Sequence, residues 1–121
     1  MGQPLTVRRG ELSIDLANFR VLLGQEPILL SYREYALLVY LATRAGHVAT
    51  KRQLLEEGMG RHDPGGLRMV EEHIRHLKSK LERQGRRFIE EVEGIGYRFL
   101  PQADTSGYKP QAPGSKSGEL L

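Results

Sequence analysis

The chain has 121 residues, the size of a single domain, and we expect residues 1–101 to form that domain. Its 18 lysine and arginine residues outnumber 15 acidic residues, and the net charge of +3 permits a polyanionic partner without requiring one. The absence of cysteine excludes disulfides, thiolate metal sites and a cysteine nucleophile. No run of 18 apolar residues occurs, so we expect no membrane-spanning segment and no membrane partner.

The first third of the sequence predicts β-structure. Short apolar runs that alternate with polar residues occur at 12–15 and 19–23, and a further apolar run follows at 27–30. Turn-forming residues such as Asn18 and Gly24 separate these runs, and the spacing leaves room only for hairpin-sized connections. We therefore expect an antiparallel meander of three or four strands.

Two helices are predicted next, each introduced by a capping box. The segment SYRE, which begins at Ser31, precedes leucines at helical spacing, and Gly46 ends that run. The segment TKRQ, which begins at Thr50, has the same capping pattern and predicts a shorter helix that ends at Gly58 or Gly60. A loop rich in glycine and proline follows at 60–66.

The segment RMVEEHIRHLKSKL predicts a third helix, at about 67–83. Four apolar side chains share one face at helical spacing, namely Val70, Ile74, Leu77 and Leu81. The opposite face is polar and mostly basic, and its residues are Arg68, Glu72, Arg75, His76, Ser79 and Arg83. The apolar face should dock the helix, while the polar face should be exposed.

Basic residues concentrate around this third helix. Residues 61–87 carry eight lysine and arginine residues against four acidic ones. A solvated outer face is the ordinary interpretation of a charged helix, but the position after a short helix and a loop is typical of a recognition helix. The major groove of B-DNA admits one helix, and arginine can pair there with guanine or with phosphate. We therefore expect the third helix to bind DNA in the major groove.

The last ordered segment predicts a β-hairpin. Residues 88–100 alternate on either side of Gly94-Ile95-Gly96, which is typical of a hairpin turn. Strands, three helices and a hairpin in this order predict an α+β fold, a winged helix-turn-helix with an N-terminal antiparallel sheet and a C-terminal hairpin wing. Beyond Pro101 the sequence has few large apolar residues, and we expect residues 102–121 to form a disordered C-terminal tail.

Metal and catalytic sites find little support in the sequence. His73 and His76 lie three residues apart, whereas a zinc-protease motif needs histidines four apart with a glutamate directly after the first. No cysteine or distant histidine pair supplies further ligands. No G-x-S-x-G nucleophile elbow occurs, and the carboxylates of the hairpin alternate between the faces of a strand. We expect no metal, no cofactor and no enzyme activity.

Three segments together resemble the C-terminal effector domain of the OmpR/PhoB family of bacterial response regulators. They are LLSYREYALLVYLATRAGHVATKRQLL, RMVEEHIRHLKSKL and IEEVEGIGYRF, and the likeness runs from about Leu12 to Leu100. The family's third helix follows the pattern R-x-V-D-x-H-I-x-x-L-R-x-K-L, and its wing follows G-x-G-Y-R. The matching residues are Arg68, Val70, His73, Ile74, Leu77, Lys80, Leu81, Gly94, Gly96, Tyr97 and Arg98.

The resemblance implies a domain of a two-component system that binds double-stranded DNA to control transcription in the bacterial cytoplasm. The third helix would enter the major groove, and the wing at 88–100 would reach the adjacent minor groove. The loop at 60–66 would be available to RNA polymerase. Because a single module of this size binds weakly alone, we expect two copies to bind in tandem to repeated half-sites. No receiver domain precedes the first predicted strand, so we expect either an excised effector domain or a stand-alone regulator.

The same resemblance assigns the DNA contacts. Base specificity would come from Arg68, Glu72, Arg75 and His76. Anchoring to the DNA backbone would come from Lys51, His73, Lys78 and Tyr97. We include Met69 among the DNA-binding residues, where it replaces a common threonine of the family.

Acidic residues mark the departures from the family pattern. Glu72 occupies a position that is usually small or neutral, where a carboxylate could accept from a cytosine amine or repel phosphate. Glu91 and Glu93 place negative charge on the wing, which opposes its approach to a minor groove. The alternative is therefore a winged helix used for contact with a protein, either RNA polymerase or a partner regulator.

Overall fold

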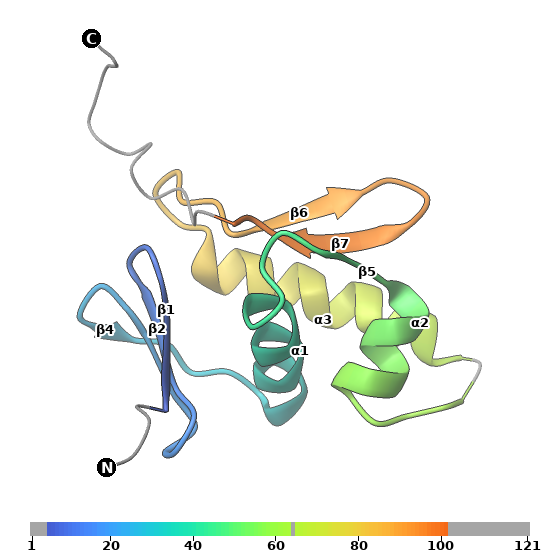
Figure 1. The fold of residues 1–121 in the computed structure, drawn as a ribbon, viewed down its shortest axis with the longest axis horizontal. Helices are drawn as coiled ribbons and strands as arrows, with labels where there is room; N and C mark the ends of the chain where they lie inside the picture. The colour runs from blue at the N-terminus through green and yellow to red at the C-terminus, as the bar shows by residue number, and fades with distance from the viewer. Residues whose placement is uncertain (1–4, 64, 102–121) are drawn as a thin grey trace, which may run out of the picture.

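The structure, a computed structural model, describes residues 5–63 and 65–101, and the predicted tail at 102–121 lies outside them. The first four strands, β1 (Thr6–Arg9), β2 (Leu12–Asp15), β3 (Arg20–Leu23) and β4 (Glu26–Pro27), form an antiparallel sheet in chain order (Figure 1). The predicted meander is confirmed, with two differences. A strand at 6–9 precedes the predicted ones and pairs along its whole length with β2, and the apolar run at 27–30 is a strand only at its start.

Helix α1 (Tyr32–Ala42) begins at the predicted capping box. The backbone N–H of Glu34 donates to the Ser31 hydroxyl at 3.1 Å, and the Glu34 carboxylate accepts from the Ser31 backbone N–H at 3.0 Å. The helix ends before Gly46, whose φ of +90° belongs to the turn that follows. Its leucines at the predicted spacing are fully buried, which confirms the inner face.

The second helix starts as predicted but changes type. Strand β5 (Val48–Thr50) leads into α2 (Lys51–Gln53), and the Thr50 hydroxyl caps it by accepting from the Gln53 backbone N–H at 3.0 Å. The chain then widens into a π-helical turn, η1 (Leu54–Gly58), where the Met59 backbone N–H donates to the carbonyl of Leu54 at 2.9 Å. The helical residues end at Gly58, one of the two predicted ends, but the α-helix itself covers only 51–53, and the π-helical turn was not predicted.

Helix α3 (Gly66–Leu81) starts one residue earlier and ends two residues earlier than predicted. It ends because Gln84 and Gly85 both adopt positive φ, and because the Glu82 carboxylate accepts from the backbone N–H groups of Phe88 and Ile89 at 2.7 and 2.8 Å. Arg83, which we placed on the exposed helical face, therefore lies beyond the helix. Its guanidinium pairs with Glu26 of β4 at 3.1 Å.

The predicted wing is confirmed. Strands β6 (Ile89–Val92) and β7 (Gly96–Phe99) form the hairpin, and β7 also pairs with β5, which gives a second antiparallel sheet in the order β5-β7-β6. A cross-strand ion pair between Arg98 and Glu90 lies on the hairpin. The pairing with β5 fixes the wing to the start of α2.

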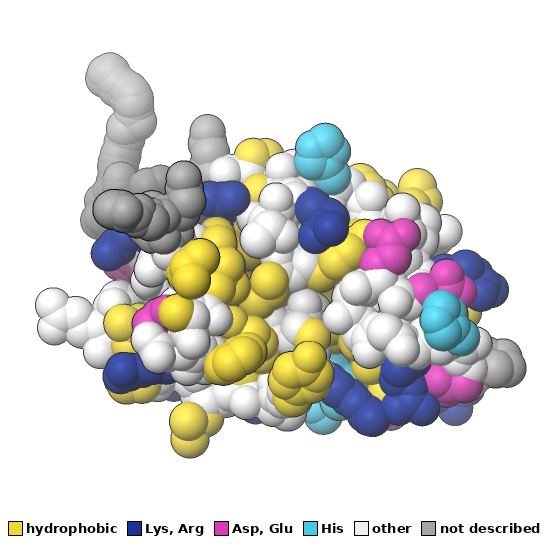
Figure 2. Space-filling model, turned by 60° about the horizontal axis from the view of Figure 1, so that its bottom comes forward, with side chains coloured by type: hydrophobic (Ala, Val, Ile, Leu, Met, Phe, Trp, Pro, Cys, Tyr) yellow, Lys and Arg dark blue, Asp and Glu magenta, His cyan; other side chains and the backbone are white. Residues whose placement is uncertain are grey.

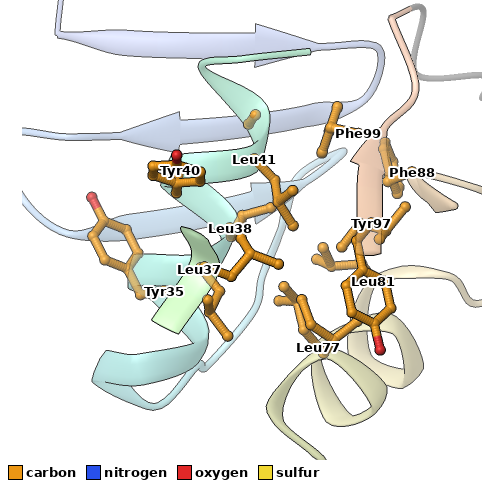
Figure 3. Packing of buried hydrophobic residues seen from close by; sticks show 14 of the residues in the cluster. Tyr35, Leu37, Leu38, Tyr40, Leu41, Leu77, Leu81, Phe88, Tyr97 and Phe99 are labelled. Carbon is orange, nitrogen blue, oxygen red and sulfur yellow. The ribbon is translucent and has the colours of Figure 1, made fainter. Parts of the chain in front are cut away.

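One apolar core joins these parts. Leucines of α1 and α3 meet Phe88, Tyr97 and Phe99 of the hairpin in Figure 3, and the rings of Phe88 and Phe99 lie 6.0 Å apart. The buried side of α3 consists of Gly66 and the four predicted residues Val70, Ile74, Leu77 and Leu81. The architecture is the predicted α+β winged helix-turn-helix. None of its helices, within the described ranges, has the length and apolarity to cross a membrane.

Candidate nucleic-acid interface

Helix α3 runs beside the hairpin and close to α2 (Figure 1), and the side opposite its apolar stripe is polar. Arg68, Glu72, Arg75 and His76 are all exposed on it. Figure 2 shows charged and histidine side chains gathered at the right-hand end of the molecule, which carries α2 and the start of α3. The four residues that we predicted to give base specificity therefore share an accessible surface.

A hollow separates this face from the wing, and we call it the α3–wing hollow. Its polar lining combines three cations with two carboxylates and one phenol, and its apolar lining is Ile74. The polar residues are Lys51, Glu71, Arg75, Lys78, Glu91 and Tyr97. The predicted anchors Lys51, Lys78 and Tyr97 thus come together with Arg75. Positive charge exceeds negative charge there, which suits an anionic ligand such as a phosphate.

An ion pair inside the hollow holds Lys51 in place. Its ammonium lies 2.6 Å from the carboxylate of Glu71, so the start of α2 is tied to α3. The hydrogen bond from Lys51 lowers the pKa of Glu71, and the same bond raises the pKa of Lys51. Both side chains are therefore charged at neutral pH. A phosphate that binds Lys51 would have to compete with Glu71 for the ammonium.

Tyr97 is less accessible than we predicted for a residue that touches DNA. Only 5% of it is exposed, and it points from β7 toward α3 (Figure 3). Burial raises the pKa of its phenol, and the nearby charge of Glu91 raises the pKa further, so the group stays protonated at neutral pH. The ring therefore packs between the wing and α3, and Tyr97 offers little surface to a ligand in the hollow that it lines.

The opposite flank of α3 faces α1, and we call it the α1 flank. Its side chains come from Met69, His73, His76 and Lys80. The sulfur of Met69 accepts from the Arg33 guanidinium at 3.5 Å, and His73 is half-buried. Both were predicted to contact DNA, but the structure turns them toward α1 and away from the outward face that carries Arg68. Their contact with DNA stays a prediction, restricted to the edge of the helix.

A buried carboxylate organises the α1 flank. Glu34 is 4% exposed, and its carboxylate accepts from the Lys80 ammonium at 2.7 Å. Burial alone would raise the pKa of Glu34, but the hydrogen bonds from Lys80 and from the Ser31 backbone outweigh it and hold the pKa below its usual value. Glu34 is therefore ionised in the folded chain at neutral pH.

Replacing Lys80 by methionine is expected to lower the free energy of unfolding near pH 7 by about 1–2 kcal/mol, since it leaves a buried carboxylate without its ammonium partner. The lowered pKa of Glu34 contributes stability above its unfolded pKa, and that contribution is lost as the pH falls through the folded pKa. The deficit of the variant should therefore shrink near pH 4. Urea unfolding of the parent and the variant at both pH values measures this difference in the free energy of unfolding. Lys78→Met is the control, because Lys78 faces Glu82 at 3.9 Å near the surface and should cost about 0.5 kcal/mol or less.

Sequence reasoning missed two features of this surface. It identified Glu34 as part of a capping box but could not place it against α3, because residues 34 and 80 are far apart in the sequence. It treated Glu91 as a charge on the wing, whereas the side chain lines the hollow together with Lys51. A signal for the first feature existed, since residues 73, 76 and 80 form a polar stripe at helical spacing.

The chain matches known proteins in sequence and in structure. Residues 24–99 match the family model described as "Transcriptional regulatory protein, C terminal". The transcriptional regulatory protein SrrA of Staphylococcus aureus is 37% identical over 89 residues, which cover 71% of this chain and 37% of SrrA. The chain thus spans little more than a third of the length of this relative.

Solved structures give the same result. The DNA-binding domain of RstA from Klebsiella pneumoniae, solved in complex with the RstA box, superimposes with a TM-score of 0.71 at 34% identity and covers 80% of this chain and 98% of that one. The response regulator DrrB of Thermotoga maritima, an OmpR/PhoB homologue, gives a TM-score of 0.71 at 33% identity over 79% of this chain and 44% of DrrB. The chain therefore belongs to the family of C-terminal domains of transcriptional regulatory proteins, of the OmpR/PhoB type.

Proposed function

We propose that this chain binds double-stranded DNA in a sequence-specific manner and thereby controls transcription in a bacterial cytoplasm. Helix α3 enters the major groove, and the β6–β7 hairpin approaches the adjacent minor groove. The observation that carries the proposal is the exposed face of α3, where Arg68 and Arg75 stand on the outward side while the apolar stripe is fully buried. A helix that is docked on one side and basic on the other is suited to insertion into a groove.

The contacts divide into those that read bases and those that hold the backbone. Arg68 and Arg75 can each pair with guanine, and the exposed His76 and Glu72 supply a further donor and an acceptor on the same face. Lys51 and Lys78 lie beside the α3–wing hollow and are placed to neutralise phosphates. This division gives specificity to the outward face and anchoring to the hollow.

The relatives support the proposal. The family model is one of transcriptional regulatory proteins, and the RstA domain, which this chain resembles over most of its length, was solved bound to its DNA box. A single module of this size buries about 600–1,000 Å² of protein surface on DNA and binds weakly alone. We therefore propose tandem binding of two copies to repeated half-sites. The function requires no catalytic group, and we assign none.

Contact with a protein is the second candidate function. The exposed carboxylates of Glu72, Glu91 and Glu93 favour it, because negative charge repels the DNA backbone. The segment before α3, of which the structure describes residues 60–63 and 65, is the surface that we propose for RNA polymerase. Gly66, which we had included in that loop, is the first residue of α3.

Titration with a duplex of random sequence, at several salt concentrations, separates the two functions. DNA binding through cations such as Lys51 and Lys78 should weaken steeply as salt rises, with a slope of about −0.9 in log K against log salt for each phosphate neutralised. Fluorescence anisotropy of a labelled duplex measures this slope. If the chain showed no binding to the duplex at low salt, the DNA-binding proposal would be wrong and the protein-contact function would remain.

A further inference from the structure

The α1 flank contains a cluster of potential metal ligands that the proposed DNA contacts do not explain. Glu34 of α1 lies opposite His73 and His76 of α3, and one candidate ligand atom from each lies within 4.8 Å of the other two. We call this group the Glu-His-His cluster. The sequence places two histidines one turn apart, and the fold adds a third candidate ligand from a distant helix.

His73, one of the three residues of this cluster, has an unsatisfied ring nitrogen. Its Nδ1 atom is buried and has no hydrogen-bond partner among the described residues. A buried polar atom without a partner costs free energy, so native structures rarely leave one without a function or an unseen ligand. A metal ion would satisfy this nitrogen through its lone pair.

The carboxylate has one oxygen available. Oε1 of Glu34 accepts from Ser31 and Lys80, whereas Oε2 lies 4.0 Å from Nδ1 of His76. Glu34 can therefore bind a cation through Oε2 while Oε1 keeps its present partners. The adjacent ammonium of Lys80 repels a cation and sets a limit on the affinity of the site.

The donor set fits a transition metal better than a hard cation. Two imidazole nitrogens and one carboxylate oxygen form a frequent three-ligand set for Zn²⁺, with water in the fourth position. Metal–ligand distances of about 2.0–2.1 Å place tetrahedral ligand atoms roughly 3.3 Å apart, so the three side chains, whose ligand atoms lie within 4.8 Å of one another, must draw together by at most about 1.5 Å. His76 is exposed and can change rotamer to close this gap.

We propose that Glu34, His73 and His76 bind one divalent transition-metal ion, with Zn²⁺ the best match to the ligands. The ion would cross-link α1 to α3. It would also hold the imidazole of His76 at the edge of α3, away from the outward face that carries Arg75. The ion would thereby remove one of the proposed base-reading side chains, a consequence that rests on the proposed function, whereas the metal site itself does not.

The site is tested without DNA, on the full 121-residue chain free of any histidine tag. Zn²⁺ is titrated by calorimetry, and Co²⁺ is titrated by visible absorption, which reports coordination geometry. We expect one ion per chain. His76→Gln should weaken binding by at least about tenfold, since loss of an outer partner alone typically costs 10- to 100-fold. His62→Gln, at an exposed histidine in the loop before α3, is the matched control and should bind as the parent does.

Lys80→Gln is expected to change the affinity for the metal ion in the opposite direction to His76→Gln. Removing the ammonium takes away one of the two donors to Oε1, leaving the Ser31 backbone N–H, and it also removes the charge repulsion, so this variant should bind the ion more tightly than the parent chain. Histidine side-chain NMR signals should shift for His73 and His76 on addition of Zn²⁺ and stay unchanged for His47 and His62. Agreement of the metal-free spectra of each variant and the parent confirms that the variant is folded. Absence of binding, or equal weakening by His76→Gln and His62→Gln, would overturn the proposal and indicate adventitious surface binding only.

Discussion

Replacing Arg75 by alanine is expected to weaken binding to a specific duplex by about 1–3 kcal/mol. Arg75 is exposed, and it belongs both to the outward face of α3 and to the α3–wing hollow. Its guanidinium can therefore pair with a guanine edge or a phosphate when α3 lies in the groove. Because the side chain takes no part in the apolar core, the free energy of unfolding should change little. Fluorescence anisotropy titrations measure the loss of affinity, with a duplex that the parent chain enriches from a pool of random sequences.

The control for Arg75 is Arg20→Ala, which removes the same charge from an exposed position on β3 of the N-terminal sheet. Both variants lower the net charge equally, so a purely non-specific electrostatic effect would weaken binding by a similar amount in each. We expect the Arg20 variant to keep its affinity to within about 0.5 kcal/mol. Equal losses in the two variants would contradict the assignment of α3 as the DNA-reading helix.

Replacing Gly96 by alanine is expected to cost about 3 kcal/mol or more in the free energy of unfolding. A methyl group at this position would lie 2.0 Å from the backbone oxygen of Ala49 and 2.8 Å from Cα of Thr50. Since backbone atoms rather than a flexible side chain cause the clash, β5 and β7 must separate to relieve it. The wing would lose its attachment to the start of α2. Urea unfolding followed by circular dichroism measures the change.

Gly94→Ala is the matched comparison, two residues away in the same hairpin. Gly94 has a φ of +79° and no atom within 4 Å of an added methyl group, so the cost is that of a left-handed backbone alone, about 1–2 kcal/mol. Gly94 is therefore needed for the backbone conformation of the turn, and Gly96 for the close approach of β5 and β7. If both variants lost the same stability, the close approach of β5 and β7 would not be the cause.

The fold could be predicted from the sequence because its local signals agree. The capping boxes at Ser31 and Thr50 begin the two helices where the structure has them, and the apolar stripe of α3 is the buried one. The end of α3 could not be predicted, because it depends on a carboxylate, Glu82, that accepts from backbone groups six and seven residues later. The π-helical turn at 54–58 had no signal that we recognised.

The candidate site was predictable only in part. Helical periodicity places Arg68, Glu72 and Arg75 on the outward face, and the structure agrees. Periodicity gives no information about what packs against the two flanks of the helix. The position of Glu34 beside His73 on one flank, and of Glu91 beside Lys51 on the other, follows from tertiary packing.

The proposed function depends above all on the exposed face of α3, which we propose reads base sequence. Selection of bound fragments from a pool of random duplexes tests it most directly, with the parent chain and the Arg75→Ala variant selected in parallel. We expect an enriched motif, repeated in tandem, for the parent chain, and loss of preference at one base position of that motif for the variant. Retention of fragments without any enriched motif, or an identical motif for parent and variant, would contradict it.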